Sequence, residues 1–363
     1  MSGDTTVAAS HSLNNGRRAK PRFTDQVITM AHGAGGLASE ALVDSVFRTA
    51  FTDSELLRAD DGAVLELDSS LSGLVDLVMT TDSFVVRPRR FPGGSIGTLA
   101  ICGTVNDLCV MGAKPRWLSV AFVLEEGFAV EELRAIVADM AEMANRSGVR
   151  VVAGDTKVVE RGAADGCYVT TTGIGTRVKH RALGAEQVKV GDSVIVSGRL
   201  GDHGMAVMLA RGDLALSADI ESDCAPLNDL IEAVVLAAPN VRWMRDPTRG
   251  GLASALNELV RANNLSVKLE ETSLPVMPAV AGACELLGID PLYVANEGKV
   301  VLVVPPNEAD AALGALRSHP LGLHAAVIGT INAEPSRIVM VRTAFGGERI
   351  VDLLVGDPLP RIC

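Results

Sequence analysis

The feature that most constrains the fold is an alternation of short apolar runs with helical patterns along the chain. Strand-like runs at 63–67, 74–80, 117–124, 149–153 and 167–175 are interleaved with helical patterns at 36–51, 95–111 and 130–145. Strands that alternate with helical segments of this length predict an α/β fold. Aromatic residues make up only 3% of the chain and apolar residues 48%, so we expect a core of aliphatic side chains.

The second half repeats the alternation after a basic, polar stretch at 177–191. Helices are predicted at 203–211, 227–236, 251–263, 279–287 and 308–317, and strands at 194–196, 266–269, 292–295, 300–304, 324–329 and 338–342. The length also suggests about two domains. We therefore predict a disordered extension (1–23), two α/β domains (24–185 and 186–345) and a flexible C-terminal tail (346–363).

Charge and cysteine usage exclude several classes of protein. The net charge is −11, and no block of Lys and Arg follows the first 25 residues, which argues against nucleic-acid binding. No apolar run is long enough to span a membrane, and the N-terminal segment lacks the apolar stretch of a secretory signal. The six cysteines are scattered without a C-x-x-C pair, which favours a reducing, cytoplasmic location.

Acidic residues stand repeatedly where apolar runs end. They are Asp60, Asp61, Asp82, Asp107, which follows Asn106, and Asp155. In open α/β sheets ligands bind at strand ends, and Mg²⁺ takes one or two carboxylates together with substrate phosphates. Each aspartate alone is more often a turn former or a helix cap. Taken together, beside glycines, they predict a site for metal and phosphate.

Four further segments carry polar groups that could serve such a site. Glycine-rich stretches at 32–36 and 92–97 run into helices, whose N-termini favour anions, although ordinary turns explain them as well. The segment 244–252 contains Asp246 between Arg245 and Arg249, which suits a metal ligand flanked by phosphate-binding cations, or a plain capped turn. Glu297 lies in N-E-G-K at 296–299, where a hairpin turn is the alternative. There is no Walker A motif.

The sequence ends with G-D-P-L-P-R-I-C at 356–363. The two prolines favour an extended segment that joins neither a helix nor a central strand. Nine extended residues, 355–363, can span roughly 30 Å. A thiol at the tip of such an arm suits a carrier of a reactive group, and a frayed end with a chance cysteine is the alternative.

Several of these strings together resemble the PurM-like ATP-binding superfamily. They are M-A-H-G at 30–33, D-D-G-A at 60–63, T-D-S-F at 81–84, G-T-V-N-D-L-C-V-M-G-A at 103–113 and A-G-D-T at 153–156. The aspartate motifs are shared with thiamine-monophosphate kinase, aminoimidazole ribotide synthetase and selenophosphate synthetase. The terminal P-R-I-C at 360–363 is more specific and resembles the HypE family of hydrogenase maturation factors. The resemblance covers about residues 24–363.

The resemblance implies an activity and a set of roles. In that family a carbamoyl group delivered by HypF is carried on the terminal cysteine, here Cys363, and is dehydrated with ATP to a thiocyanate. The cyanide then passes to iron on a HypC–HypD complex. Glu297 would be the general base, and Lys157 would steady the carbamoyl group or the γ-phosphate. The ATP-binding positions would be Asp60, Asp61, Asp82, Asn106, Asp107, Asp155 and Asp246, with Mg²⁺ on Asp61, Asp82, Asp107 and Asp155.

The resemblance also implies an architecture, in which the N-terminal sheets of two chains pair into a β-barrel across a homodimer. Two other functions stay open from the sequence. Another small-molecule kinase or amide-activating ligase of the superfamily would not need the terminal cysteine. A nucleotide-regulated scaffold would bind ATP without releasing ADP.

Overall fold

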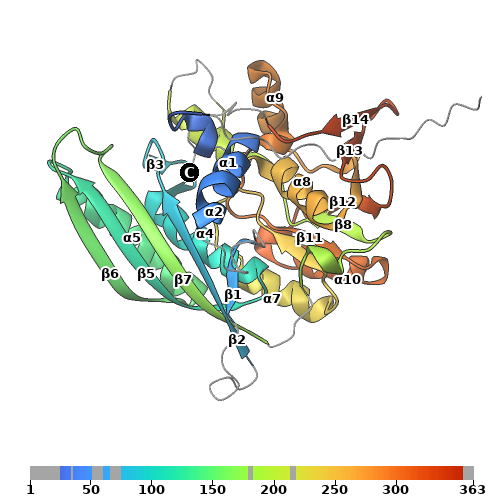
Figure 1. The fold of residues 1–363 in the computed structure, drawn as a ribbon, viewed down its shortest axis with the longest axis horizontal. Coiled ribbons are helices and arrows are strands. Elements are labelled where there is room, and N and C mark those ends of the chain that lie inside the picture. The colour runs from blue at the N-terminus through green and yellow to red at the C-terminus, as the bar shows by residue number, and fades with distance from the viewer. Residues whose placement is uncertain are drawn as a thin grey trace, which may run out of the picture.

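The computed structural model describes residues 25–33, 36–50, 60–65, 75–178, 183–212 and 218–354. Its first half is built on a five-stranded sheet in the order β1-β2-β7-β5-β6 (Figure 1). Neighbouring strands are antiparallel except for the parallel pair β5–β6. The strands are β1 (Ala63–Leu65), β2 (Val75–Phe84), β5 (Lys114–Glu125), β6 (Arg150–Val159) and β7 (Cys167–Val178). The strands predicted at 63–67, 74–80, 117–124 and 167–175 therefore form, although residues 66, 67 and 74 lie outside the described chain.

Helices α4 (Ile96–Val110) and α5 (Val130–Ser147) cover one face of this sheet, as predicted (Figure 1). A short hairpin, β3 (Arg90–Phe91) and β4 (Gly94–Ser95), leads into α4. The Ser95 side chain accepts hydrogen bonds from the backbone N–H groups of Gly97 and Thr98, and Thr98 Oγ1 accepts one from the Ser95 N–H. This capping box fixes where the helix begins. Almost every residue of α4 is buried, because the helix lies between the sheet and the second half of the chain.

The opposite face of the first sheet is uncovered, and its edge strand β6 is exposed along almost its whole length. Val152 and Val158 are 55% and 68% exposed. The prediction of a buried strand at 149–153 was therefore wrong: a strand forms there, but it lies at the sheet edge. Within one chain this sheet is open among the described residues and does not close into a barrel.

The second half contains a seven-stranded sheet in the order β14-β13-β10-β12-β8-β11-β9. Only the pair β10–β13 is parallel. The strands are β8 (Ser193–Val196), β9 (Trp243–Arg245), β10 (Ser266–Glu270), β11 (Val301–Val304), β12 (Ala326–Asn332), β13 (Val339–Arg342) and β14 (Glu348–Val351). The helices are α6 (Asp202–Ala210), α7 (Asn228–Ala237), α8 (Gly251–Asn263), α9 (Pro278–Leu287) and α10 (Ala309–Arg317).

Two expectations for this half are corrected. The apolar run at 292–295 does not form a strand, because Asp290 caps a 3₁₀ turn, η5 (Pro291–Tyr293), by accepting a hydrogen bond from the Leu292 N–H. Residues 348–351, assigned to the tail, form β14 and pair with β13. Further 3₁₀ turns are η1 (Met30–Gly33), η3 (Ala185–Gln187), η4 (Glu271–Ser273), η6 (Pro306–Glu308) and η7 (Pro320–Gly322).

The segment before the first sheet packs against the second half of the chain. The helix predicted at 36–51 is split into α1 (Leu37–Leu42), a π-helical turn η2 (Val43–Phe47) and α2 (Arg48–Ala50). Glu40 on α1 forms an ion pair with Arg261 on α8 at 2.6 Å.

One continuous hydrophobic core contains side chains from α4 and α5 as well as from α6, α7 and β11, so the two halves pack directly on each other.

Among the described residues, no helix combines the length and apolar character needed to cross a bilayer.

Candidate functional site

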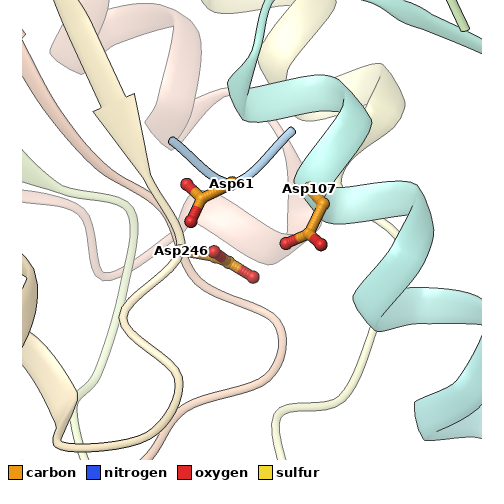
Figure 2. Close-up of side chains that lie close together, drawn as sticks. All are labelled: Asp61, Asp107 and Asp246. Carbon is orange, nitrogen blue, oxygen red and sulfur yellow. The ribbon is translucent and has the colours of Figure 1, made fainter. Parts of the chain in front are cut away.

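Three aspartates from distant parts of the chain meet where the two halves join. Asp61 lies just before β1, Asp107 lies on α4, and Asp246 follows β9; one carboxylate oxygen from each lies within 4.8 Å of the others. Figure 2 shows the three side chains close together, with the carboxyl group of Asp246 between those of Asp61 and Asp107. These residues are called the acidic cluster below, and all three were predicted from the sequence.

The acidic cluster is electrostatically unfavourable by itself. Burial raises the pKa of Asp61 and of Asp107 well above the usual range, and the neighbouring carboxylates add to it. Burial also raises the pKa of Asp246, to about 6, although Arg245 opposes the rise. Hard oxygen donors suit Mg²⁺, whose octahedral site places opposite ligands roughly 4.2 Å apart. The spacing and the donor type therefore fit a divalent cation.

Neighbouring polar groups hold the cluster in place. Arg245 forms ion pairs with Asp61 at 2.8 Å and with Glu258 at 2.6 Å. The Thr80 hydroxyl lies 2.8 Å from both Asp107 Oδ2 and the Asp61 backbone oxygen. Sequence reasoning missed Thr80 and Glu258, because a threonine inside a strand and a glutamate inside an amphipathic helix carry no signal of their own.

A cavity of about 380 Å³, called the acidic pocket below, contains the cluster. Its wall combines α1, η2, the ends of β2 and β9, and the first turns of α8. The lining residues that carry side-chain polar groups are His32, Ser39, Asp61, Thr80, Thr81, Asp82, Asp107, Arg245, Asp246, Thr248, Arg249, Ser254 and Glu258. Asp82, predicted as a metal ligand with Asp61 and Asp107, and Arg249, predicted as a possible phosphate-binding residue, both lie in this wall. Burial raises the pKa of Asp82, while Arg249 lowers it.

Not every predicted site residue lines the acidic pocket. Asp60 lines a neighbouring cavity, also of about 380 Å³, beside Arg48 and Leu353. Asp155 and Lys157 are exposed on β6, where they form an ion pair at 3.4 Å. Cys363 lies outside the described residues.

Asn106 departs from its predicted role. It is fully buried, and its amide group bonds to three backbone groups of the second half: it donates to the oxygens of Ala225 (3.1 Å) and Glu297 (2.9 Å), and it accepts from the N–H of Leu227 (2.8 Å). These bonds use both amide hydrogens. The side chain is therefore not placed to bind a nucleotide.

Glu297 lies in a buried loop, residues 296–299, called the Glu297 loop below. The loop connects η5 to β11, so the alternative of a hairpin turn was wrong. Glu297 is only 3% exposed. Burial, and after it Cys224, Asp246 and Asp82, raise the pKa of its carboxyl well above the usual range. Glu297 does not itself line the acidic pocket, but its carboxyl interacts electrostatically with Asp246 and Asp82, which do. A buried carboxyl with a raised pKa near such a site is typical of a catalytic acid or base.

The glycine-rich stretch at 92–97 has a structural role. A Cβ atom on Gly97 would lie 2.3 Å from the backbone oxygen of Ile136, so only glycine lets α4 and α5 approach this closely. Its Ser95 is occupied by capping α4. Ala34 and Gly35 of the stretch at 32–36 lie outside the described residues.

Family models match both halves of the chain. Residues 59–177 match the AIR synthase related protein N-terminal domain, and residues 189–342 match the C-terminal domain of the same proteins. Thiamine monophosphate kinase structures share the fold at 18–20% identity, with TM-scores of 0.63 and 0.66.

Closer relatives match nearly the whole chain. The carbamoyl dehydratase HypE of Rhodobacter capsulatus is 54% identical over 339 residues, which covers 93% of this chain and 99% of that one. The HypE of Escherichia coli K12 is 45% identical over 336 residues, with the same coverage. A crystal structure of the hydrogenase maturation protein HypE in complex with ATP has a TM-score of 0.77 at 43% identity, covering 92% of this chain and 98% of that one.

A crystal structure of a HypE–HypF complex has a TM-score of 0.80 at 46% identity, covering 86% of this chain and all of that one. Together with the two domain matches, these likenesses extend over both sheets and the acidic cluster between them. The chain therefore belongs to the HypE family of carbamoyl dehydratases, which are hydrogenase maturation proteins.

Proposed function

We propose that the protein uses ATP to dehydrate a carbamoyl group carried on the sulfur of Cys363, forming a thiocyanate that supplies cyanide to the Fe(CN)₂CO centre of [NiFe]-hydrogenase. The relatives' name, carbamoyl dehydratase, and the ATP complex of one HypE support the class of reaction.

The observation that carries the proposal is the contact between Leu354 and the start of α1. The backbone oxygen of Leu354 accepts a hydrogen bond from the Leu37 N–H at 3.4 Å. Leu37 begins α1, and Ser39 of α1 lines the acidic pocket. The nine residues from 355 to 363 can span roughly 30 Å when extended, so Cys363 can reach the pocket.

The residues of the acidic pocket divide between metal and phosphate. The acidic cluster would hold Mg²⁺, which would neutralise the charge of the ATP phosphates and orient the γ-phosphoryl group. Asp82 lies in the same wall and would take a second position on the metal or its waters. Arg249, close to the start of α8, would contact phosphate oxygens, because both the guanidinium and a helix N-terminus favour anions.

Both N–H protons and the carbamoyl oxygen must leave. The carbamoyl oxygen attacks the γ-phosphorus and ADP leaves, which converts a poor leaving group into phosphate. The NH₂ group loses one proton as this bond forms, which gives S–C(OPO₃)=NH. The phosphate then departs and carries away the second N–H proton as hydrogen phosphate, which leaves S–C≡N. Glu297 would accept the first proton, and the raised pKa of its carboxyl makes it a stronger base than an ordinary glutamate.

A second copy of the chain would cover the open face of the first sheet and form the β-barrel of a homodimer. This face carries paired hydroxyls, Ser83 with Thr170 and Thr81 with Thr172, each pair 2.9 Å apart, and it ends in the exposed strand β6. In such a dimer Asp155 and Lys157 would act in the site of the partner subunit, since they do not line their own acidic pocket.

Sedimentation of the Val152→Lys variant would test the dimer. A charge near the start of β6 should shift the protein toward monomer, whereas Leu236→Lys on α7, where Leu236 is 77% exposed, should leave the oligomeric state unchanged. A wild-type protein that sediments as a monomer at micromolar concentration would contradict the dimer.

The partners follow from the reaction. HypF would deliver the carbamoyl group, as the HypE–HypF complex of a relative suggests, and a HypC–HypD complex would accept the cyanide. A carrier thiol needs a reducing compartment, so we expect the protein to work in the cytoplasm.

Mass spectrometry of the C-terminal peptide tests the function. After incubation with HypF, carbamoyl phosphate and ATP, we expect a carbamoyl adduct on Cys363 that loses the mass of one water. Glu297→Gln should retain the adduct and fail to lose water. An unmodified Cys363 would refute the proposal, and water loss at the wild-type rate in Glu297→Gln would refute the role of the base. A kinase of the same fold would keep its activity after deletion of Ile362 and Cys363.

A further inference from the structure

The Glu297 loop is anchored at both flanks to residues that adjoin the acidic cluster. We infer that two buried amide side chains, Asn106 and Asn296, are positioning residues that hold Glu297 at a fixed place relative to the acidic cluster. This inference deepens the proposed function and rests on it, because it assumes that Glu297 is the base.

Asn106 forms the first anchor, and it crosses from one half of the protein to the other. It lies on α4, directly before Asp107 of the acidic cluster. Its amide nitrogen donates to the backbone oxygen of Glu297 at 2.9 Å and to that of Ala225 at 3.1 Å, and its oxygen accepts from the Leu227 N–H at 2.8 Å. Two consecutive residues of α4 thus contact different parts of the site: Asn106 holds the backbone of Glu297, and Asp107 belongs to the acidic cluster.

Asn296 forms the second anchor from inside the loop. It is 1% exposed, and its amide nitrogen donates to the backbone oxygens of Pro247 (3.0 Å) and Val294 (3.1 Å). Its own backbone N–H also donates to the Pro247 oxygen at 3.1 Å, and its side-chain oxygen accepts from the Gly201 N–H at 2.8 Å. Pro247 directly follows Asp246, so this anchor also ends beside a member of the acidic cluster.

Asp223 contacts the rest of the Glu297 loop through both of its carboxylate oxygens. One carboxylate oxygen of Asp223 accepts from the Glu297 N–H at 3.1 Å, and the other pairs with Lys299 at 3.0 Å. A Cβ atom on Gly298 would lie 1.8 Å from the Asp223 backbone oxygen, so only glycine fits there. Every residue of N-E-G-K therefore has a contact that restrains the position of Glu297.

This arrangement matters because a general base must lie within hydrogen-bond reach of the proton it removes. A displacement of about 1 Å at a reacting group can cost on the order of 10²-fold in rate. Loss of one anchor should therefore lower the rate of dehydration while leaving ATP binding, which depends on the acidic pocket, intact.

The matched control is Asn257 on α8. It is equally buried, at 3% exposure, and its amide nitrogen likewise donates to two backbone oxygens, those of Ala253 and Val351, both at 2.9 Å. Asn257→Ala should perturb stability comparably to Asn106→Ala without touching the Glu297 loop. Comparison of the two variants separates positioning from general destabilisation.

The test measures single-turnover water loss from the carbamoylated Cys363 and the ATP dissociation constant. We expect Asn106→Ala to slow water loss about 10- to 100-fold, with ATP affinity within about twofold of wild type, and Asn257→Ala to keep both values. Asn106→Asp keeps the size and the acceptor but can donate at most one hydrogen bond, and Asn296→Asp tests the second anchor. Wild-type rates in folded Asn106→Asp and Asn296→Asp would overturn the inference.

Hydrogen exchange supplies a readout that does not require turnover. In Asn106→Ala the peptides covering 223–228 and 294–300 should exchange faster than in wild type, whereas in Asn257→Ala they should not. Unchanged exchange in these peptides would overturn the inference that Asn106 anchors the Glu297 loop. Faster exchange, together with a wild-type protein that forms no thiocyanate, would leave the anchors standing and refute the proposed function instead.

Discussion

Replacing Asp107 with Asn should make the metal-free protein more stable and abolish its response to Mg²⁺. The Asp61, Asp107 and Asp246 oxygens lie within 4.8 Å of one another in a buried site. Two unit charges about 4.8 Å apart at an effective dielectric constant of about 20 repel by about 3.5 kcal/mol. Asp107 faces two such neighbours. The hydrogen bond from Thr80 can be kept, because the Asn side-chain oxygen also accepts.

The expected gain in folding stability is smaller than the sum of the two Coulomb repulsions. Burial raises the pKa of Asp61 and of Asp107, which favours the neutral form of each carboxyl, and Arg245 offsets part of the charge that remains. We therefore expect a stabilisation of about 1–3 kcal/mol, which for a chain of this size is about 2–4 °C in the unfolding temperature. Wild type should gain about 2.7 kcal/mol from Mg²⁺ at roughly 100 times its dissociation constant, and Asp107→Asn should gain none.

Thermal unfolding with and without Mg²⁺ measures both effects. Asp139→Asn is the control, because Asp139 is also an aspartate beside α4 but pairs with Arg90 on the surface, at 2.7 Å. It should bring no stabilisation and leave the response to Mg²⁺ intact. An Asp107→Asn protein that unfolds at a lower temperature than wild type without metal, or that still gains stability from Mg²⁺, would refute the reasoning.

Two further predictions concern the surroundings of Glu297. Gly298→Ala should destabilise the protein by about 3 kcal/mol or more and abolish dehydration, because the new Cβ would lie 1.8 Å from the Asp223 backbone oxygen. The control is Gly314→Ala on α10, where nothing lies within 4 Å of the new Cβ; it should stabilise the protein by about 0.5–1 kcal/mol in denaturant unfolding. A Gly298→Ala protein as stable as wild type would contradict the close contact. Burial raises the pKa of Asp202 to about 6, so this group's contribution to stability is present below about pH 4 and is lost as the pH rises through about 6. Asp202→Asn should therefore raise the unfolding temperature at about pH 8, by an amount equivalent to about 1–2 kcal/mol, and have little effect at about pH 4; an equal shift at both values would show that titration of Asp202 is not the cause.

The sequence predicts the members of the acidic cluster because each can be recognised from its immediate sequence neighbours. Asp61 adjoins an apolar run that becomes β1, Asp246 lies in a polar segment that leads into α8, and Asp107 lies on a helix of small, apolar residues. Their convergence follows from packing the two halves against each other. By contrast, the exposure of β6 depends on the order of strands in the sheet, which an apolar run does not reveal.

Asn106 shows where the sequence is ambiguous. Adjacent polar residues on a buried helix point about 100° apart, so N-D gives no indication of which one faces the ligand. The structure assigns the backbone contacts to Asn106 and the cluster to Asp107. The strand at 348–351 was predictable, since Gly346-Gly347 between two apolar runs is a hairpin signal that the assignment to a tail overlooked.

The proposed reaction requires that ATP activates the carbamoyl oxygen on Cys363, and an isotope label on that oxygen shows whether it does. The carbamoyl group is labelled with ¹⁸O at its carbonyl oxygen, loaded onto Cys363 by HypF, and allowed to react with unlabelled ATP in a single turnover. The account predicts one ¹⁸O atom in the inorganic phosphate and a thiocyanate on Cys363. Label released into water, with unlabelled phosphate, would contradict it.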